Sequence, residues 1–186
     1  EELKPVADVI KKYNLIAVSD ELYAELTYPP AKHYSIAAFP DMKKRTVVIN
    51  GLSKAFAMTG WRIGFATGPS ELIGAMNRIH QYVIMSSPTT AQYAAIEALK
   101  NGDREVIKMR KEYDRRRKIV LSAMEKCGCE CFEPLGAFYV FPSIKSTNMT
   151  SSEFCEKFLK EEKVAIVPGG AFGDCGEGYV RISYAA

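Results

Sequence analysis

The chain has 186 residues, of which 47% are hydrophobic, and its formal net charge is +3. The length is sufficient to bury a real core, and the hydrophobic share is that of an ordinary globular protein. The small charge argues against a nucleic-acid-binding protein, and no apolar run approaches the roughly 18 residues of a membrane-spanning helix.

The first third of the chain predicts a helix followed by strands. Residues 1–13 predict the helix, and residues 15–19 (LIAVS) form a continuous apolar run typical of a parallel strand that is buried on both faces. After a connector rich in proline and aromatic residues, residues 46–50 (TVVIN) are a second such run, which Gly51 ends. Residues 63–67 predict another strand, because glycines punctuate them.

Helices are predicted in the middle of the chain. Ser70 opens the first as its N-cap, and Ser87 followed by Pro88 opens the second, which ends at Asn101 and Gly102. We expect the domain boundary near Gly102.

A long helix is predicted over residues 103–126. Its apolar residues form one stripe, and its charged residues lie largely opposite. The stripe consists of Val106, Met109, Tyr113, Val120 and Met124. The basic run of residues 115–118 therefore indicates a solvated helix face rather than a nucleic-acid site.

The last part of the chain predicts short strands around one helix. Residues 129–132, 137–141 and 164–167 have strand patterns, and Thr150 with Glu153 predicts a capping box. In a final strand, residues 178–184 (GYVRISY), alternation places Tyr179, Arg181 and Ser183 on one face.

Polar residues follow two of the predicted strands. Asp20 and Tyr23 come after the first strand, and Lys54 comes after the second. If both strands belong to one parallel sheet, Asp20 and Lys54 emerge at the same edge, where such sheets bind ligands. Taken singly, Lys54 fits a solvated loop charge, Asp20 a turn cap and Tyr23 a half-buried aromatic residue.

Arg181 has two readings of the same kind. It fits a charge on an edge strand, and it also fits a fixed fork for a carboxylate, which a guanidinium recognises through two parallel hydrogen bonds.

Together these residues resemble the class I aminotransferases of fold type I, which use pyridoxal phosphate (PLP). The resemblance runs from about Leu15 to the C-terminus and includes the strings AFAMTGWRIGF, GAFYVFP and VPGGAFG. It implies an α/β fold, in which a mixed, mostly parallel sheet is joined to a smaller α+β C-terminal domain. Residues 1–102 would be the C-terminal half of the large PLP-binding domain, and residues 103–186 the small domain without its last helix.

The resemblance also implies roles for individual residues. Lys54 would be the catalytic Schiff-base lysine, Asp20 would contact the pyridine nitrogen, and Tyr23 the phenolic oxygen of PLP. Arg62 would hold the phosphate, and Arg181 would bind the substrate carboxylate.

One departure concerns the phosphate contacts. Many members of the family have serines three residues before and immediately before the lysine, whereas this chain has Gly51 and Ser53 at these positions. Ser53 is therefore a cofactor-binding candidate, although such a serine is often only a turn residue. A phosphate contact is expected to be missing at Gly51 or supplied by backbone N–H groups.

The function implied is PLP-dependent transfer of an amino group from an L-amino acid, with aspartate or an aromatic residue favoured, to a 2-oxo acid. The same residues suit a PLP-dependent lyase such as a carbon-sulfur β-lyase. The family's N-terminal part, with its glycine-rich cofactor loop, has no counterpart here. The chain alone is therefore expected to be inactive, and a folded dimer-forming module is the non-enzyme alternative.

The five cysteines argue against a zinc site. They form no CxxC pair, and neither His33 nor His80 lies near them in the sequence. Reduced cysteines indicate a cytoplasmic protein. We expect a homodimer that binds neither metal, nucleic acid nor membrane.

Overall fold

The structure is a computed structural model that describes residues 2–185. It divides into two compact units, one up to Lys108 and one from Met109 onward. This division falls inside a continuous helix, and a point within a helix does not define where a domain begins. The domain boundary expected at residue 102 therefore stays a prediction.

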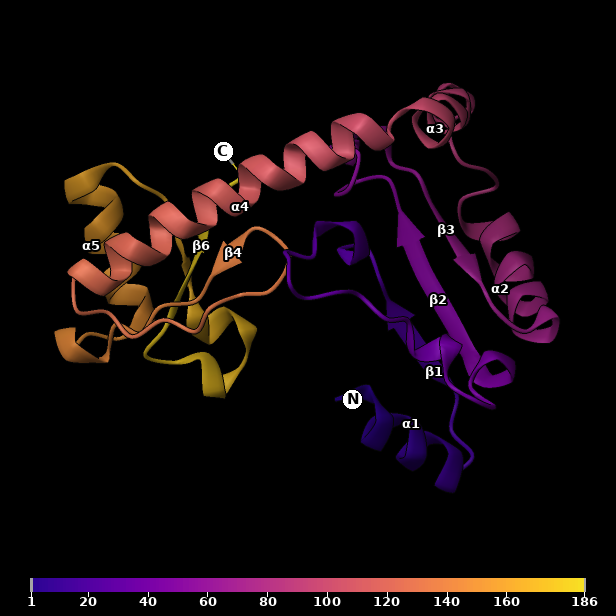
Figure 1. Ribbon diagram of the computed structural model, residues 1–186, viewed down its shortest axis with the longest axis horizontal. Helices are drawn as coiled ribbons and strands as arrows, with labels where there is room; N and C mark the ends of the chain where they lie inside the picture. Colours follow the sequence, from indigo (N-terminus) through magenta and orange to yellow (C-terminus); the bar gives the residue numbers. More distant parts are fainter. Residues whose placement is uncertain (1, 186) are drawn as a thin grey trace. The chain divides into compact units, whose positions relative to one another are not determined.

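The first unit contains a mixed three-stranded sheet (Figure 1). Its strands are β1 (Ala17–Asp20), β2 (Thr46–Gly51) and β3 (Gly64–Thr67), with β2 in the centre. β1 pairs with β2 in parallel, and β3 pairs with β2 in antiparallel orientation. The mixed sheet and the parallel pairing of the first two strands confirm the predicted α/β class.

The burial predicted for the first strand is wrong. β1 begins two residues later than the apolar run, and its side chains alternate between half-buried and exposed. Val18 is 68% exposed. The physical reason is that β1 lies at the edge of the sheet, and only one of its faces is packed, since Ala17 lies in a cluster with Ala7 and Met42.

The helices of the first unit follow the predicted order. They are α1 (Leu3–Lys12), α2 (Ser70–Val83) and α3 (Thr89–Asn101). The prediction that Ser70 is the N-cap of α2 is wrong, because Ser70 is the first residue of the helix. Pro69 occupies the cap position and makes no side-chain hydrogen bond. The first residue of the predicted 1–13 helix lies outside the described residues.

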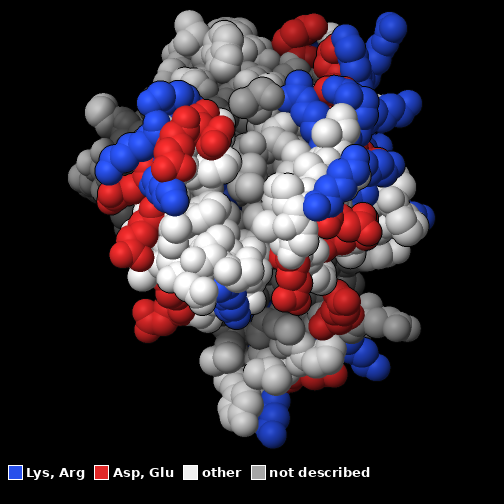
Figure 2. All heavy atoms as spheres, turned by 90° about the vertical axis from the view of Figure 1, so that its left-hand side faces the viewer, with Lys and Arg blue, Asp and Glu red and all other residues white. Residues whose placement is uncertain are grey.

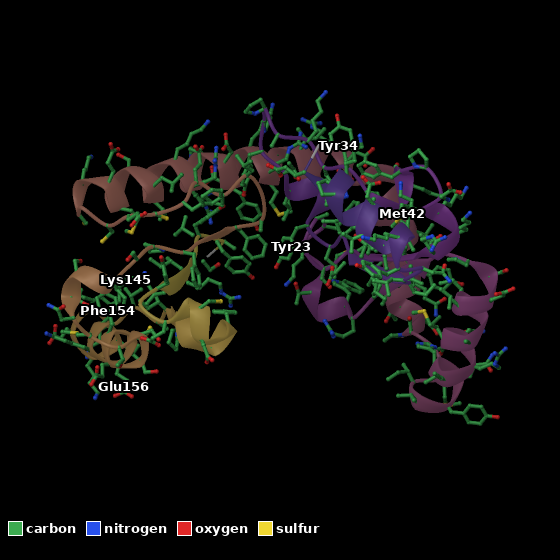
Figure 3. All side chains as sticks on the ribbon, turned by 90° about the horizontal axis from the view of Figure 1, so that it is seen from below. Tyr23, Tyr34, Met42, Lys145, Phe154 and Glu156 are labelled. Atoms are coloured by element: carbon green, nitrogen blue, oxygen red, sulfur yellow. The ribbon has the colours of Figure 1, made fainter. Side chains whose placement is uncertain are left out.

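Two apolar clusters hold the first unit together. Met42, labelled in Figure 3, is fully buried with Ala7 and Ile36 between α1 and the sheet. Leu52 and Ala95 belong to the second cluster, which joins the end of β2 to α3. Short 3-10 helices connect these elements, at Ala24–Leu26, Ile36–Ala38, Lys43–Arg45 and Thr59–Trp61.

Helix α4 (Asp103–Lys126) has the predicted bounds. Its apolar stripe is turned inward, but the prediction that all four basic residues 115–118 form a solvated face is wrong for Arg117. The Arg117 side chain is only 4% exposed and pairs with Asp114 and Glu133 at 2.8 and 2.7 Å. It also donates to the carbonyl oxygen of Pro134, so these partners replace water around a buried charge.

The second unit has a small antiparallel sheet in the order β4-β6-β5. These strands are β4 (Tyr139–Val140), β5 (Val167–Pro168) and β6 (Val180–Ser183). They are shorter than predicted, and residues 129–132 do not form a strand. In that segment one backbone bond, from Ser143 N to the oxygen of Glu130, takes the place of a strand ladder.

Helix α5 (Ser151–Glu162) covers this small sheet (Figure 1). The predicted capping box between Thr150 and Glu153 is confirmed. Figure 3 labels Phe154 and Glu156 on α5; Phe154 packs toward the core, whereas Glu156 is exposed. Cys155 is buried with Ile144 and Val180, and this cluster forms the core of the unit. Short 3-10 helices lie at Lys145–Thr147, Gly169–Phe172 and Asp174–Gly176.

Charges of both signs are mixed on the surface. Figure 2 shows acidic and basic side chains beside one another on the face that it presents. On α4, Glu112 pairs with Arg115 and Arg116, and Lys118 pairs with Asp114. Between residues 2 and 185, no helix is both long and apolar enough to cross a bilayer.

Candidate active site

A tightly wound loop carries Lys54. After β2 ends, the backbone N–H groups of Phe56 and Met58 both bond to the carbonyl oxygen of Leu52. The loop also forces Ala57 into a left-handed conformation, with φ of 53°. Such a conformation costs of order 1 kcal/mol in a residue other than glycine, so the surrounding hydrogen bonds must hold it. The lysine is thereby fixed close to the end of its strand.

Lys54 and Tyr23 lie together at the same edge of the sheet. The Lys54 Nζ atom lies 5.9 Å from the centre of the Tyr23 ring, which is labelled in Figure 3. Both residues are partly buried. The predicted juxtaposition follows from the parallel pairing, since Asp20, the last residue of β1, pairs with Ile49 near the end of β2.

Asp20 is exposed, and one of its oxygens caps a turn. Oδ1 accepts the backbone N–H of Leu22 at 3.1 Å. The prediction that Asp20 caps a turn is therefore confirmed. The carboxylate can accept further hydrogen bonds, because it has two oxygens and several lone pairs. Asp20 is thus a fixed anion at the sheet edge that Lys54 and Tyr23 share.

The next residue, Glu21, is buried in a polar network that sequence analysis missed. Its Oε1 accepts hydroxyl hydrogen bonds from Ser19 at 3.0 Å and Ser35 at 2.6 Å, and its Oε2 lies 2.9 Å from Nε2 of His33. Burial alone raises the pKa of the Glu21 carboxyl, but the bonds from Ser35, His33 and Ser19 outweigh burial and bring the pKa below its usual value. The network ties the Asp20–Tyr23 turn to the segment that precedes Ile36.

The structure explains the glycine at position 51. Gly51 pairs with Gly64 across β2 and β3. A Cβ atom added to Gly51 would lie 3.0 Å from the Gly64 Cα and 3.1 Å from the Ile63 oxygen. Because real Cβ atoms rarely approach so closely, a larger residue requires the neighbouring backbone to shift by a few tenths of an ångström. The close approach of two paired backbones therefore disfavours a serine at this position.

Arg62 lies at the end of the same loop in a strained backbone conformation. Its φ and ψ are 53° and 54°, and one of its terminal nitrogens donates to the oxygen of Thr59 at 2.9 Å. The residue is exposed. It lines an open cleft of about 390 Å³, together with Ala57, Gly60, Trp61, Pro88, Thr90 and Ala91. The position suits recognition of an anion that enters this cleft.

Ser53 is partly buried beside Lys54. Its carbonyl oxygen accepts a hydrogen bond from the Thr59 hydroxyl at 2.8 Å, which helps to close the loop. This contact uses the backbone of Ser53, so the role of its side chain stays a prediction.

Arg181 lies on β6, the central strand of the second unit. Its guanidinium carbon lies 4.4 Å from the centre of the Tyr139 ring and 4.5 Å from that of Phe172. Val180 and Ile182 pack toward the core, in agreement with the predicted alternation along the strand. Sequence analysis did not find the two rings, because they come from segments about 10 and 40 residues away.

The residues of the first unit fit PLP chemically. A primary amine beside an aromatic ring, a carboxylate on the adjacent strand end and a guanidinium at the mouth of a cleft match an aldehyde, a pyridine nitrogen and a phosphate. These three functional groups are found on one loop and one neighbouring turn. The observed set is therefore compatible with this cofactor.

Metal-binding clusters are not observed. Within residues 2–185, no group of three or more His, Cys, Asp or Glu side chains could hold a metal ion. The cysteines of this part of the chain are free thiols: Cys127, Cys129, Cys131, Cys155 and Cys175. Burial raises the pKa of the Cys155 thiol, which therefore favours its neutral form.

Comparison with known proteins identifies the family. The family model "Aminotransferase class I and II" matches residues 1–186. The chain is 56% identical over 185 residues to the putative aminotransferase YugH of Bacillus subtilis, covering 100% of this chain and 48% of that protein. It is 50% identical over 186 residues to the aspartate aminotransferase of Pyrococcus abyssi, covering 99% and 48%.

A solved structure agrees with these relatives. The crystal structure of the aromatic aminotransferase from Pyrococcus horikoshii superposes with a TM-score of 0.95 at 50% identity, covering 99% of this chain and 50% of that one. The chain thus spans about half the length of the relatives that it matches. The fold, the lysine loop and these similarities together lead to one conclusion: the chain belongs to the class I and II aminotransferase family, whose members use PLP.

Proposed function

We propose that the protein transfers the amino group of an L-amino acid, with aspartate or an aromatic residue favoured, to a 2-oxo acid. The observation that carries this proposal is the approach of the Lys54 amine to within 5.9 Å of the Tyr23 ring centre, at the sheet edge shared with Asp20. The family membership of the whole chain supports it. Relatives that are named for aspartate and aromatic substrates support the substrate class.

In this proposal the first unit holds the cofactor. Asp20 contacts the pyridine nitrogen and keeps it protonated, since a carboxylate favours a neighbouring cation. The Tyr23 hydroxyl would donate a hydrogen bond to the phenolic oxygen, and Arg62, which lines the cleft, would bind the phosphate through two N–H groups. Ser53 is a further candidate for a phosphate contact. When bound, PLP supplies the electron sink that makes the α-hydrogen of an amino acid acidic.

Lys54 has two tasks in the proposed reaction. Its amine would hold the cofactor covalently through the aldehyde group. As a free amine, Lys54 would accept the proton from the substrate α-carbon as general base and would later return a proton as general acid. One side chain thus acts first as base and then as acid.

Arg181 is proposed to bind the α-carboxylate of the substrate. In the described part of the chain, its guanidinium forms neither an ion pair nor a hydrogen bond, so its N–H groups are available to a ligand. A forked pair of charge-assisted bonds would fix the orientation of the substrate carboxylate.

We further propose a homodimer in the cytoplasm. The free thiols of the described residues support a reducing compartment. Large apolar side chains on α2 and α3 support an assembly partner, since Tyr82 is 91% and Tyr93 71% exposed. Sedimentation of the full-length protein tests this; a monomer at micromolar concentration would contradict the dimer.

Activity is tested with the full-length protein that contains this chain. L-Aspartate and 2-oxoglutarate should yield glutamate, whereas pyruvate and ammonia from L-cystathionine would indicate the lyase alternative. Lys54→Ala should lower turnover by at least about 10²- to 10⁴-fold, because it removes the proton-transfer group as well as the attachment point. The visible absorbance of bound PLP should disappear in the same variant.

The folded-module alternative is tested with the chain alone. Mixed with PLP, the chain either develops a visible absorbance that depends on Lys54 or does not. Absence of the signal in both the chain and the full-length protein would overturn the proposed enzyme.

A further inference from the structure

The surroundings of Arg181 are unusual for a surface strand. β4 and β5 flank β6 on its two sides. Tyr139 belongs to β4, and Phe172 lies in the short helix that follows β5, so the two rings reach Arg181 from opposite sides of its strand. At 4.4 and 4.5 Å, both distances lie within the range of cation–π contacts. Two aromatic rings thus contact the guanidinium, which remains partly exposed.

Both rings are themselves held in place. The Tyr139 ring packs against Phe138, with centroids 4.8 Å apart. Phe172 meets the edge of Phe141 at 5.9 Å, and Phe141 stacks on Tyr179 at 5.7 Å. The rings are thus parts of one aromatic cluster, in which Phe172 is 47% exposed.

The backbone around Phe172 is fixed as well. Gly169 and Gly176 approach so closely that a Cβ atom on Gly169 would lie 2.0 Å from the Gly176 oxygen. Ser151, at the start of α5, accepts the N–H of Gly170 and donates to Glu177, which joins the loop to the helix. These contacts tie the segment that precedes Phe172 to the start of α5.

We propose that Tyr139 and Phe172 are positioning residues that form an aromatic slot for a guanidinium ion, and that this slot sets the plane in which Arg181 receives a carboxylate. Both rings lie against the guanidinium, so a ligand must reach the N–H groups that the rings do not cover. A planar carboxylate that approaches these groups can form both hydrogen bonds at once. This inference rests on the proposed role of Arg181 in binding the substrate.

A slot for guanidinium should retain its affinity when the arginine side chain is removed. In Arg181→Ala, free guanidinium ion at low millimolar concentration should enter the space between the rings and restore part of the amino-acid binding. Restoration should saturate with concentration. Ammonium chloride at the same ionic strength should restore less, because ammonium lacks the planar fork.

The experiment uses the full-length protein loaded with PLP. Binding of 2-methyl-L-aspartate, which has no α-hydrogen to lose, is measured by calorimetry, and KM and kcat are measured with L-aspartate. Arg181→Ala should weaken binding by roughly 100-fold or more. An unchanged affinity in this variant would overturn the proposed role of Arg181, and the slot with it.

The ring variants test the slot separately. Tyr139→Leu and Phe172→Leu should each raise KM by roughly 5- to 30-fold with a smaller change in kcat, a factor typical of a lost cation–π contact. Tyr139→Phe and Phe172→Tyr keep a ring and should recover binding. Phe158→Leu is the matched control, because Phe158 stacks on Phe154 in the same unit and has no contact with Arg181.

The decisive comparison combines the variants. In Arg181→Ala with both rings replaced by leucine, guanidinium should no longer restore binding. If guanidinium still restores it equally well, or if neither ring replacement weakens binding while Arg181→Ala does, the slot is wrong and the carboxylate role stands. Thermal unfolding checks that each variant folds, and the single-ring variants give the same comparison if the triple variant does not.

Discussion

The two units position their functional side chains by different means. In the first unit, the strand end at Asp20 and the tight loop around Lys54 set the positions through the backbone. In the second unit, a side chain on a plain strand is oriented by the rings of Tyr139 and Phe172. The difference suggests that backbone changes should disturb cofactor binding, whereas ring changes should disturb substrate binding.

The strongest test of this comparison is removal of the Glu21 carboxylate. Glu21→Ala should lower the free energy of unfolding by about 3 kcal/mol, because it removes the buried acceptor of three hydrogen bonds, from Ser19, Ser35 and His33, each worth about 1 kcal/mol. PLP affinity should fall as well, since the turn that carries Asp20 and Tyr23 loses its anchor. Denaturant titration and fluorescence of bound PLP measure the two effects.

Ser19→Ala is the control for Glu21, because it removes only one of the donors to the carboxylate. It should cost about 1 kcal/mol. Equal losses in the two variants would show that the network does not act through Glu21.

A smaller effect is expected at the crossing of β2 and β3. Gly51→Ser should destabilise the protein by about 2 kcal/mol, since its Cβ meets the Gly64 backbone at 3.0 Å. It should weaken PLP binding rather than add a phosphate contact. Gly74→Ser is the matched control, because a Cβ there meets nothing within 4 Å. Tighter PLP binding in Gly51→Ser would argue against the backbone account.

In the second unit, loss of a helix cap should change stability without changing the site. Thr150→Ala removes the capping box of α5 and should cost about 1 kcal/mol. The KM for amino acids should stay within about twofold, since Arg181 is oriented by rings and not by this cap. Thr150→Ser keeps the hydroxyl and should keep the stability. A large rise in KM would contradict the separation of cap and site.

The smallest effect is expected from an exposed ion pair on α4. Hydrogen bonds from Arg115 and Arg116 lower the pKa of Glu112 from 4.5 to about 2. Because the folded-state pKa is depressed, its contribution to stability is present above pH 4.5 and is lost as the pH falls toward 2. Glu112→Gln should flatten this part of the acid unfolding curve. An unchanged curve would show that solvent screening cancels the pair.

Sequence analysis correctly predicted the features that depend on a local sequence pattern. The bounds of α4 are confirmed, and so is the common sheet edge of Asp20 and Lys54, because apolar periodicity and strand ends are local signals. Roles of individual site residues stay predictions, since no ligand contact tests them.

Long-range contacts escaped sequence analysis. His33 and Ser35 reach Glu21 across 12 and 14 residues of a connector without regular pattern. The close approach of Gly51 to Gly64 on another strand was also missed, whereas the missing phosphate contact at Gly51 stays a prediction. The buried Arg117 in a basic run was missed in the same way, since its partner Glu133 lies outside the helix.

The rings beside Arg181 affect the hydration of its guanidinium. A guanidinium in solution is hydrated around its whole surface, and a carboxylate that binds it must displace part of that water. Tyr139 and Phe172 have already removed water from much of the Arg181 surface when the chain folds. Part of the dehydration cost of binding is therefore met during folding, which leaves more of the charge attraction to hold the substrate.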